Sequence, residues 1–367
     1  MNSPTSALEL RAPARWQRFI APLITPEIFD FWAARVHPTL SWQRPLARVV
    51  ERTQASVDAI TLRLKPNRHW AGFRAGQHVN LAVEVGGTRL TRSYSLSDAP
   101  RADGSIAITV KAIEGGRVSQ QLFRAAKVGD VFDIGPAFGE MTIAASPQSP
   151  IALLAAGSGI TPLMAMIRAL AADGMPAPVT LMYWARTREE FCFADELREL
   201  AKKFPAFRVV FFLTRAEAAS ADERQGRIGN EAIALLADVE KHQIFACGPG
   251  GFTEAARTLV AATAQSFMAE AFTPPPQIVD ETGEVEITLT RSQRTLTVPR
   301  GQSILSALEA QGVRPAHGCR MGICNTCACA KPSGTTKNLH SGNVNAEPAL
   351  ALRICINGAT SNLTLDL

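Results

Sequence analysis

The sequence predicts a multidomain protein in which an antiparallel β-barrel is followed by an α/β domain with a parallel sheet and by a small β-rich domain. Three observations predict this order: alternating strands begin at Leu46, strand–helix repeats begin at Ile151, and a Thr–Pro–Pro–Pro run starts at Thr273. At 367 residues the chain is too long for one hydrophobic core. We expect the segments 1–43, 44–146, 147–272, a proline linker at 273–283, and 284–367.

Segment 1–43 is rich in aromatic and aliphatic residues, and Pro22, Pro26 and Pro38 break it into short helical pieces. Two interpretations stay open. The segment is a strap that packs on the next domain, or it is a docking surface that gives peripheral contact with a membrane-bound partner.

Segment 44–146 has the pattern of an antiparallel barrel or sandwich, because short alternating or β-branched runs are separated by turn residues. One helix is expected among these strands, at 118–126. The predicted strands are 47–50, 57–64, 78–85, 89–96 and 106–113.

Segment 147–272 alternates apolar strands with helices, which implies βα units and a parallel sheet. The predicted strands are 151–155, 179–183, 208–213 and 242–246, and the predicted helices are 162–172, 194–204, 230–236 and 251–264. The last segment begins with strands at 285–290 and 294–299 and a helix at 303–311, and it ends in a cysteine loop and two short strands.

Composition and charge exclude several classes of protein. The chain is 46% hydrophobic and 19% charged, which is typical of globular rather than disordered proteins. A net charge of +5 without a basic stripe argues against a nucleic-acid partner. Residues 141–167 carry no charge, but prolines and a Gly–Ser–Gly turn interrupt them, so we interpret them as loop, strand, turn and helix. Residues 1–16 show no secretory signal, and we expect a cytoplasmic protein.

The cysteines carry the strongest signal. Cys319, Cys324 and Cys327 form the pattern C-x4-C-x2-C, and Cys355 follows in a later strand. Four thiolates are what two tetrahedral irons require beyond their bridging sulfides, and this spacing is typical of plant-type 2Fe-2S ferredoxins. Zinc is the competing interpretation, but structural zinc sites usually use two short cysteine pairs. We expect Cys329 and Cys192 to be small buried residues.

Two motifs in segment 44–146 suit a flavin. Arg92–Ser95 offers a guanidinium for a phosphate, the Tyr94 ring for a flavin face and the Ser95 hydroxyl for the ring edge, although a surface arginine and a strand tyrosine explain the same residues. Gly115–Ser119 favours the flavin interpretation, because this glycine turn opens a helix whose first amides can hold a pyrophosphate.

Two glycine turns in segment 147–272 follow apolar strands and open helices. The first, Ala155–Pro162, is a phosphate-cradling turn in its expected context, although it also suits a purely structural turn. The second, Cys247–Phe252, repeats that logic after the last predicted strand. Its thiol is expected at the carboxyl end of the sheet, where ligands bind in open α/β folds.

These motifs, in this order, resemble the ferredoxin–NADP reductase superfamily with a C-terminal ferredoxin domain, over roughly residues 46–367. Phenylacetyl-CoA and phthalate-type oxygenase reductases have the same order of domains, and the N-terminal strap looks most like reductases paired with bacterial acyl-CoA desaturases. The resemblance implies a flavin barrel, an α/β nicotinamide domain and a β-grasp ferredoxin domain.

The resemblance also implies roles for single residues. Tyr94, Ser95 and Cys247 would form the hydride-transfer site. The cluster ligands would be Cys319, Cys324, Cys327 and Cys355. The flavin, expected to be FAD with FMN as the alternative, would be held by Arg92, Tyr94, Ser95, Gly116, Val118 and Ser119. The nicotinamide dinucleotide would be held by Gly157, Gly159, Thr161, Gly248 and Pro249.

Arg215 and Arg224 are the expected ligands of a 2′-phosphate, which favours NADPH and leaves NADH as the alternative.

The expected function is electron transfer from NAD(P)H through FAD and a 2Fe-2S cluster to an acceptor, because a flavin converts a two-electron hydride into single electrons. The first hypothesis for the acceptor is a membrane di-iron acyl desaturase. The alternative is a soluble Rieske or di-iron ring oxygenase, and a third hypothesis is a redox sensor whose cluster only reports. We expect a monomer, and a partner with an acidic surface, since residues 284–367 hold eight Lys/Arg against five Asp/Glu.

Overall fold

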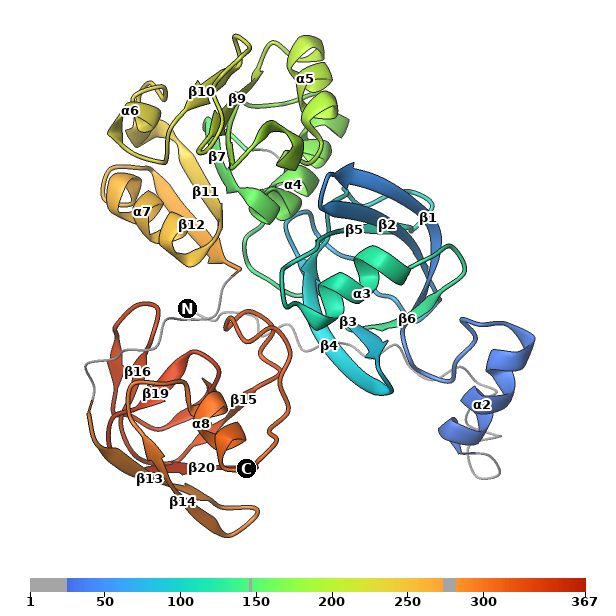
Figure 1. Cartoon of the computed structure of the whole chain (residues 1–367), viewed down its shortest axis with the longest axis vertical. Helices are drawn as coiled ribbons and strands as arrows, with labels where there is room; N and C mark the ends of the chain where they lie inside the picture. Colours follow the sequence, from blue (N-terminus) through green and yellow to red (C-terminus); the bar gives the residue numbers. More distant parts are fainter. Residues whose placement is uncertain (1–24, 145–146, 273–281) are drawn as a thin grey trace.

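The structure is a computed structural model, and it describes residues 25–144, 147–272 and 282–367 (Figure 1). The first domain spans 46–144, the second 147–272 and the third 282–367. Most of the predicted strap and of the predicted proline linker lies outside the described residues. The described order of a β domain, an α/β domain and a small β-rich domain is the order that the sequence predicts.

The first domain is a six-stranded antiparallel sheet in the order β4-β3-β6-β1-β2-β5. Its two edge strands, β4 and β5, meet at an isolated bridge between Leu96 and Ile108 and do not pair along their length, so the predicted barrel does not close by a full strand ladder. The helix α3 (Arg117–Ala125) covers one opening of the curved sheet and buries Val118 and Leu122 in its core. The strands are β1 (Leu46–Ser56), β2 (Ala59–Pro66), β3 (His78–Val85), β4 (Thr88–Ser95), β5 (Ile106–Lys111) and β6 (Val131–Ile134).

Two strands of this sheet differ from the prediction. β1 continues to Ser56 although its second half is exposed, because its backbone still pairs with β2 as far as Ser56 and Ala59. β6 was not predicted. It has only four residues, too few for an alternating pattern to be recognised, and it gains its place by pairing with both β1 and β3.

The second domain is a six-stranded parallel sheet in the order β10-β9-β8-β7-β11-β12, with apolar clusters on both faces. Its strands are β7 (Ile151–Ala156), β8 (Val179–Ala185), β9 (Phe207–Leu213), β10 (Glu223–Gln225), β11 (Gln243–Gly248) and β12 (Ser266–Ala271), and its helices are α4 (Ile160–Ala172), α5 (Ala194–Lys203), α6 (Asn230–Ile233) and α7 (Gly250–Val260). The two edge strands β10 and β12 were not predicted. The chain turns back between β7 and β11, so the carboxyl ends of these two strands form the crevice where open α/β sheets bind ligands.

In the uncharged stretch 141–167, the described residues 141–144 and 147–167 form loop segments, β7, the short turn Gly157–Gly159 and the start of α4, as interpreted from the prolines and glycines. Across the described ranges, the search for a helix with the length and apolar character of a membrane span finds none.

The third domain packs the helix α8 (Ile304–Ala310) against a mixed sheet in which β13 runs parallel to β20 and antiparallel to β14. The Ser303 hydroxyl caps α8 by accepting a hydrogen bond from the amide of Ser306. Six short strands follow α8, where two were predicted. The strands are β13 (Glu284–Leu289), β14 (Arg294–Pro299), β15 (Ala328–Lys331), β16 (Thr336–Asn338), β17 (Val344–Asn345), β18 (Ala349–Arg353), β19 (Asn357–Ala359) and β20 (Leu363–Leu365).

Only the end of the predicted strap is described. Helix α2 (Pro26–Val36) begins with a proline at its first position, and Phe29 packs edge-on against Trp42 at 5.2 Å. Residues 39–44 lie on the first domain, where the Asn67 side chain donates to the carbonyl oxygens of Thr39 and Arg44. One stripe of α2 is exposed. It consists of Ile28, Phe31, Trp32 and Val36.

Candidate functional site

The cysteine loop of the third domain brings four thiols together as two pairs. A hydrogen bond between the Cys319 and Cys324 side chains raises the pKa of Cys319 and lowers that of Cys324 to about 5. The bond between Cys327 and Cys355 lowers the pKa of Cys327 to about 7 and raises that of Cys355. Within the described ranges, no three His, Cys, Asp or Glu side chains converge as ligands of one metal ion. Two pairs rather than one triad are what a 2Fe-2S cluster requires, since each iron takes two thiolates and shares two sulfides.

The backbone of this loop points its amides at sulfur. The amides of Met321, Ile323 and Cys324 all donate to Sγ of Cys319, at 3.3 to 3.4 Å. Such donors stabilise a thiolate. Gly318 leaves the space that the loop needs, because a Cβ there would lie 2.9 Å from Sγ of Cys324. The loop therefore fits a 2Fe-2S cluster on its own geometry.

The two cysteines assigned to the core are buried. Cys329 is 8% exposed in the core of the third domain, and burial raises its pKa to about 11. Cys192 lies in the core of the second domain, where its amide donates to the Tyr183 hydroxyl at 3.2 Å. Neither residue takes part in the thiol pairs.

The paired strands β3 and β4 carry the Arg92–Ser95 motif. Arg92 is half-buried, and its pKa is lowered by burial first and then by the nearby cations Arg320 and Arg117. Its guanidinium donates to the carbonyl oxygen of Thr91 at 2.8 Å. Positive groups gathered in this way suit a phosphate, which is the role expected of Arg92.

Tyr94 and Ser95 lie beside it on β4. Burial raises the pKa of Tyr94, so the phenol stays protonated, and the residue is partly buried against the core of the first domain. The Ser95 hydroxyl is buried and has no hydrogen-bond partner among the described residues. An unpartnered buried hydroxyl costs free energy unless a ligand satisfies it, so this position fits the polar edge of a flavin ring.

The start of α3 can contact a ligand through its backbone amides but not through its side chains. The Ser119 hydroxyl accepts from the amide of Ile113, and Val118 is buried in the core, so neither side chain points at a ligand. The first turn has no acidic residue and no side-chain cap at Gly116. Its free amides and the positive end of the helix suit a pyrophosphate.

Two glycine turns meet at the crevice of the second domain. A Cβ on Gly159 would collide with the carbonyl oxygen of Cys247, so only glycine lets these two loops cross. Gly157 adopts a φ of +55°, which glycine tolerates, and the Tyr183 hydroxyl donates to its carbonyl at 3.2 Å. The side chain of Thr161 donates to the carbonyl of Ser158 at 2.9 Å and holds the turn closed.

The second turn continues from Cys247 into Gly248 and Pro249. Gly248 packs against Ala156, where a Cβ would lie 2.9 Å from the alanine methyl group, and Pro249 precedes the first turn of α7. Cys247 is fully buried, and burial together with Glu270 raises its thiol pKa well above the usual value. The cysteine is therefore a neutral thiol in the core, and it meets the Gly159 turn through its backbone carbonyl.

Two residues that the sequence reasoning missed lie at this crevice. His78 of β3 is paired with Ser95 of β4, and its Nε2 lies 3.1 Å from Oε2 of Glu270 at the end of β12. Phe138 stacks on the imidazole at 5.8 Å and Phe272 meets it edge-on at 6.0 Å.

Oγ of Ser95 and Nδ1 of His78 are buried without a hydrogen-bond partner in the described part of the chain, while Nε2 of His78 and Oε2 of Glu270 lie against one another. Such a concentration marks a ligand site. A lone strand histidine gave no signal in the sequence, and Glu270 lies in an unpredicted strand.

The two arginines expected at a 2′-phosphate differ. Arg215 follows β9 and is exposed, and in the described ranges its side chain has no ion-pair partner. The Arg224 guanidinium donates instead to the carbonyl oxygens of Ala221 and Glu223, at 2.9 and 2.6 Å. Arg215 is therefore the better placed of the two for an additional phosphate.

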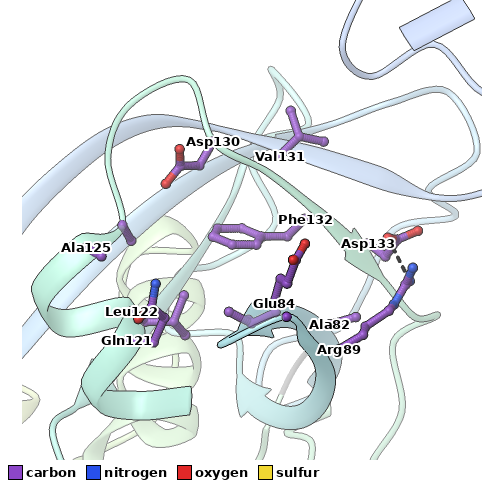
Figure 2. A pocket seen from close by; sticks show the side chains of 13 residues that line it. Ala82, Glu84, Arg89, Gln121, Leu122, Ala125, Asp130, Val131, Phe132 and Asp133 are labelled. Carbon is purple, nitrogen blue, oxygen red and sulfur yellow. Dashed lines mark ion pairs between the residues drawn. The ribbon is translucent and has the colours of Figure 1, made fainter. Parts of the chain in front are cut away.

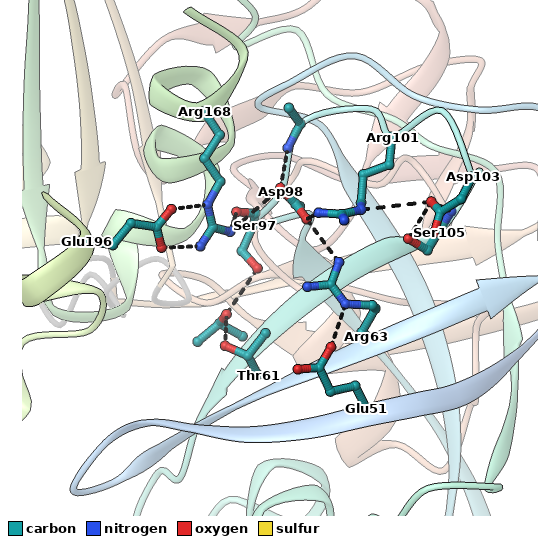
Figure 3. Close-up of polar contacts among 12 residues, drawn as sticks. Glu51, Thr61, Arg63, Ser97, Asp98, Arg101, Asp103, Ser105, Arg168 and Glu196 are labelled. Atoms are coloured by element: carbon teal, nitrogen blue, oxygen red, sulfur yellow. Dashed lines mark hydrogen bonds and ion pairs between the residues drawn. The ribbon is translucent and has the colours of Figure 1, made fainter. Parts of the chain in front are cut away.

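A polar network joins the first and second domains near a hollow of about 580 Å³ (Figure 3). Asp98 accepts from Arg63 and Arg101 of its own domain, at 3.4 and 3.1 Å. Arg168 of α4 lies 3.8 Å from Asp98, donates to the carbonyl of Ser97 at 2.7 Å and forms a bidentate pair with Glu196. Because these cations are already neutralised, the network holds domains together rather than binding an anion.

Another hollow, of about 520 Å³, lies between the β3–β4 hairpin, α3 and β6 (Figure 2). None of the residues expected to bind a cofactor lines it. Its charged lining is mainly acidic, with Glu84, Asp130 and Asp133, and its Arg89 pairs with Asp133 at 2.7 Å. This hollow does not suit a phosphate, and the candidate site remains the face of β3 and β4 and the crevice beside it.

Three family models match the chain in the expected order. They describe an oxidoreductase FAD-binding domain at residues 46–143, an oxidoreductase NAD-binding domain at 153–258 and a 2Fe-2S iron-sulfur cluster binding domain at 287–355. Flavin, nicotinamide and cluster domains are therefore all present.

Similar proteins match most of this chain. An NADPH oxidoreductase from Mycobacterium tuberculosis is 29% identical, over 96% of this chain and 92% of its own. The ferredoxin reductase component of a 3-ketosteroid-9-alpha-monooxygenase from that species is 33% identical, over 71% of this chain and 75% of its own. The solved structure of phthalate dioxygenase reductase shares the fold, with a TM-score of 0.60 and 23% identity over 88% of this chain and 97% of its own.

Proposed function

The chain belongs to the ferredoxin–NADP reductase superfamily with a C-terminal 2Fe-2S ferredoxin domain, and on that premise we propose that it is the reductase component of a soluble oxygenase. Electron transfer from NAD(P)H through FAD to the cluster is the family activity. The oxygenase partner is supported by a relative that is named as the reductase component of a monooxygenase. The desaturase favoured by the sequence alone has no such support, and the alternative hypothesis becomes the main one.

We propose the following division of work among the residues. FAD, when bound here, would supply the conversion of a two-electron hydride into single electrons. Ser95 would hydrogen-bond the ring edge, Tyr94 would cover a ring face, and Arg92 with the first amides of α3 would bind the phosphates. The crossing of Gly159 and Cys247 shapes a turn for the dinucleotide. The observation that carries the proposal is the pair of unpartnered buried polar atoms at Ser95 and His78, beside the contact of His78 with Glu270.

We further propose NADPH as the preferred donor. The support is the exposed Arg215 after β9, which has no ion-pair partner in the described ranges and is suited to a 2′-phosphate. NADH remains the alternative, since its adenosine ribose needs no cation.

Steady-state assays with the purified holoenzyme test this function. A reductase reduces cytochrome c with NADPH at many turnovers per second and reduces soluble Rieske or di-iron oxygenase components, whereas a redox sensor with a full cluster turns over negligibly. Reduction of cytochrome c without reduction of any soluble oxygenase component would leave the family activity intact and overturn the choice of partner.

A membrane-bound di-iron desaturase is the second candidate partner, favoured by the exposed stripe Ile28, Phe31, Trp32 and Val36 on α2. Arg35 lies over the Phe31 ring at 3.8 Å, a combination of aromatic and cationic groups that suits a lipid interface. Sedimentation with phosphatidylglycerol vesicles tests whether this stripe binds a lipid surface. Wild-type protein that pellets while Trp32→Asp stays in solution supports a membrane partner, and equal sedimentation of both removes that support.

A further inference from the structure

One face of the β3–β4 pair carries two adjacent polar cross-strand pairs. His78 faces Ser95, and two residues further along β3, Asn80 faces Ser93. Successive side chains of a strand alternate between faces, so these four lie on the same side of the sheet. The opposite side carries Val79 and Leu81, which are buried in the core of the first domain.

The Asn80 side chain is fixed from within its own domain. Its Oδ1 accepts from the Ser93 hydroxyl at 2.6 Å, and its backbone carbonyl accepts from the amide of Gly135 at 2.8 Å. Gly135 is close enough that a Cβ there would lie 3.2 Å from Cβ of Asn80. The carboxamide is therefore held in one orientation, with its amide nitrogen turned away from Ser93.

That amide nitrogen reaches the third domain. Nδ2 of Asn80 donates to Oγ1 of Thr326 at 3.4 Å, across a separation of 246 residues. Thr326 lies between the ligand candidates Cys324 and Cys327. On the same side, a Cβ on Gly318 would lie 3.4 Å from Oδ1 of Asn80 and 3.1 Å from Oγ1 of Thr326. The cluster loop thus comes close to the first domain at the residue that also holds the Arg92–Ser95 motif.

We infer that Asn80 is a positioning residue that seats the cluster loop, through Thr326, against the strand pair where the flavin is expected. This inference rests on the proposed electron transfer from FAD to the cluster and assigns a residue to that step. In each transfer the reduced flavin loses one electron and the oxidised cluster gains one, and no bond to Asn80 or Thr326 forms or breaks. The two side chains keep the distance between the centres short, on which the rate of electron tunnelling depends steeply.

The bond is also weak enough to be temporary. It is neutral, and neutral hydrogen bonds between exposed groups contribute little to an equilibrium. A cluster that passes electrons to a separate protein requires its domain to dissociate readily from the first domain. Because the two domains belong to one chain, the effective concentration for re-association stays high. Asn80 therefore sets the seated position without locking the third domain in it.

Anaerobic stopped-flow reduction of the holoenzyme by NADPH tests the inference, with flavin bleaching and cluster bleaching followed separately. We expect Thr326→Val and Asn80→Ala each to slow cluster reduction about fivefold while flavin reduction stays at the wild-type rate, the size expected for one lost neutral hydrogen bond. Thr326→Ser, which keeps the hydroxyl, should restore the rate. The double variant should be no slower than either single variant, because both remove the same bond.

Two further readouts separate positioning from damage. The midpoint potential and electron paramagnetic resonance spectrum of the cluster should be unchanged in Asn80→Ala, and small-angle X-ray scattering should show a larger radius of gyration for both single variants. Asn80→Ala can also disturb Ser93 and lower FAD occupancy, and in that case Thr326→Val, made in the other domain, decides. If the cluster of Thr326→Val is reduced at the same rate as the cluster of the wild-type protein, the inference is wrong. Absence of cluster reduction in the wild type would instead overturn the proposed function.

Discussion

The first domain meets its two neighbours in different ways. Toward the second domain it presents a charged network around Asp98 and an apolar core that is continuous across the boundary, since Ala59 and Met141 pack in the same cluster as β7 and α4. Toward the cluster loop of the third domain it presents the Asn80–Thr326 hydrogen bond of 3.4 Å. Lys111 adds a further ion pair on the side of the second domain, 3.0 Å from Glu190.

This difference follows from the chemistry on each side. A hydride moves only between atoms in close contact, so the domains that hold the flavin and the nicotinamide need a fixed interface. An electron can tunnel between centres that are not in contact, and the cluster must also reach a partner protein. A small interface that opens readily therefore suits the third domain better than a fixed one. The charged, continuous interface therefore belongs to hydride transfer and the sparse one to electron delivery.

The largest test removes one cluster ligand. Cys324→Ser should abolish the cluster and lower cytochrome c reduction by NADPH more than about a hundredfold, because the electron then has no exit through the third domain. Ferricyanide reduction, which the flavin supports directly, should persist, since the interface of the first and second domains is untouched. Visible absorbance and iron content report the cluster.

Cys329→Ser is the matched control, because this thiol lies in the core, outside the thiol pairs. It should keep the cluster and both activities. Loss of FAD and ferricyanide reduction together with the cluster in Cys324→Ser would mean that the two regions are not separable.

The second test concerns the dinucleotide. Arg215→Ala should raise the KM for NADPH about ten- to a hundredfold and leave that for NADH within about twofold, because a charge-assisted contact to the 2′-phosphate is lost. Steady-state ferricyanide reduction measures both constants. Arg224→Ala should have a much smaller effect, since its guanidinium already bonds backbone carbonyls. Equal effects of Arg215→Ala on both cofactors would place this side chain away from the phosphate.

The third test weakens the charged interface. Asp98→Asn leaves Arg63, Arg101 and Arg168 without their shared carboxylate, which is only 9% exposed, and should destabilise the protein by about 2 kcal/mol. The first thermal transition should fall by about 5 °C in differential scanning calorimetry. Asn80→Ala should move it by less than about 2 °C, because one neutral bond is lost. Equal shifts for the two variants would remove the contrast between the interfaces.

The smallest test uses the neighbouring pair on β3. His78→Gln should slow flavin reduction by NADPH about three- to tenfold, because Glu270 loses the imidazole that lies 3.1 Å from its carboxylate and the end of β12 can shift. Transfer from the reduced flavin to the cluster should stay unchanged. Asn80→Ala should show the reverse pattern in the same stopped-flow traces. If either variant slowed both steps, the two positions of β3 would not serve separate interfaces.

The sequence alone determined the order of domains and predicted the four candidate cluster ligands. C-x4-C-x2-C is a local pattern, because three of the four thiolates come from one loop and only Cys355 comes from elsewhere. The glycine turns could also be predicted from the sequence. A glycine between a strand and a helix indicates a backbone conformation or a close approach that other residues disfavour, and this is a local property of the chain. Candidate roles for Arg92, Ser95, Gly159 and Cys247 therefore follow from the sequence.

Tertiary structure alone decided which distant residues meet. The short strands β6, β10 and β12 carry weak patterns and exist because neighbouring strands pair with them, so Glu270 could not be placed from the sequence. His78, Asn80 and Thr326 are ordinary polar residues in isolation. Each of them acquires a candidate role only through its contact with a residue of another domain. A contact across 246 residues leaves no local pattern in the chain.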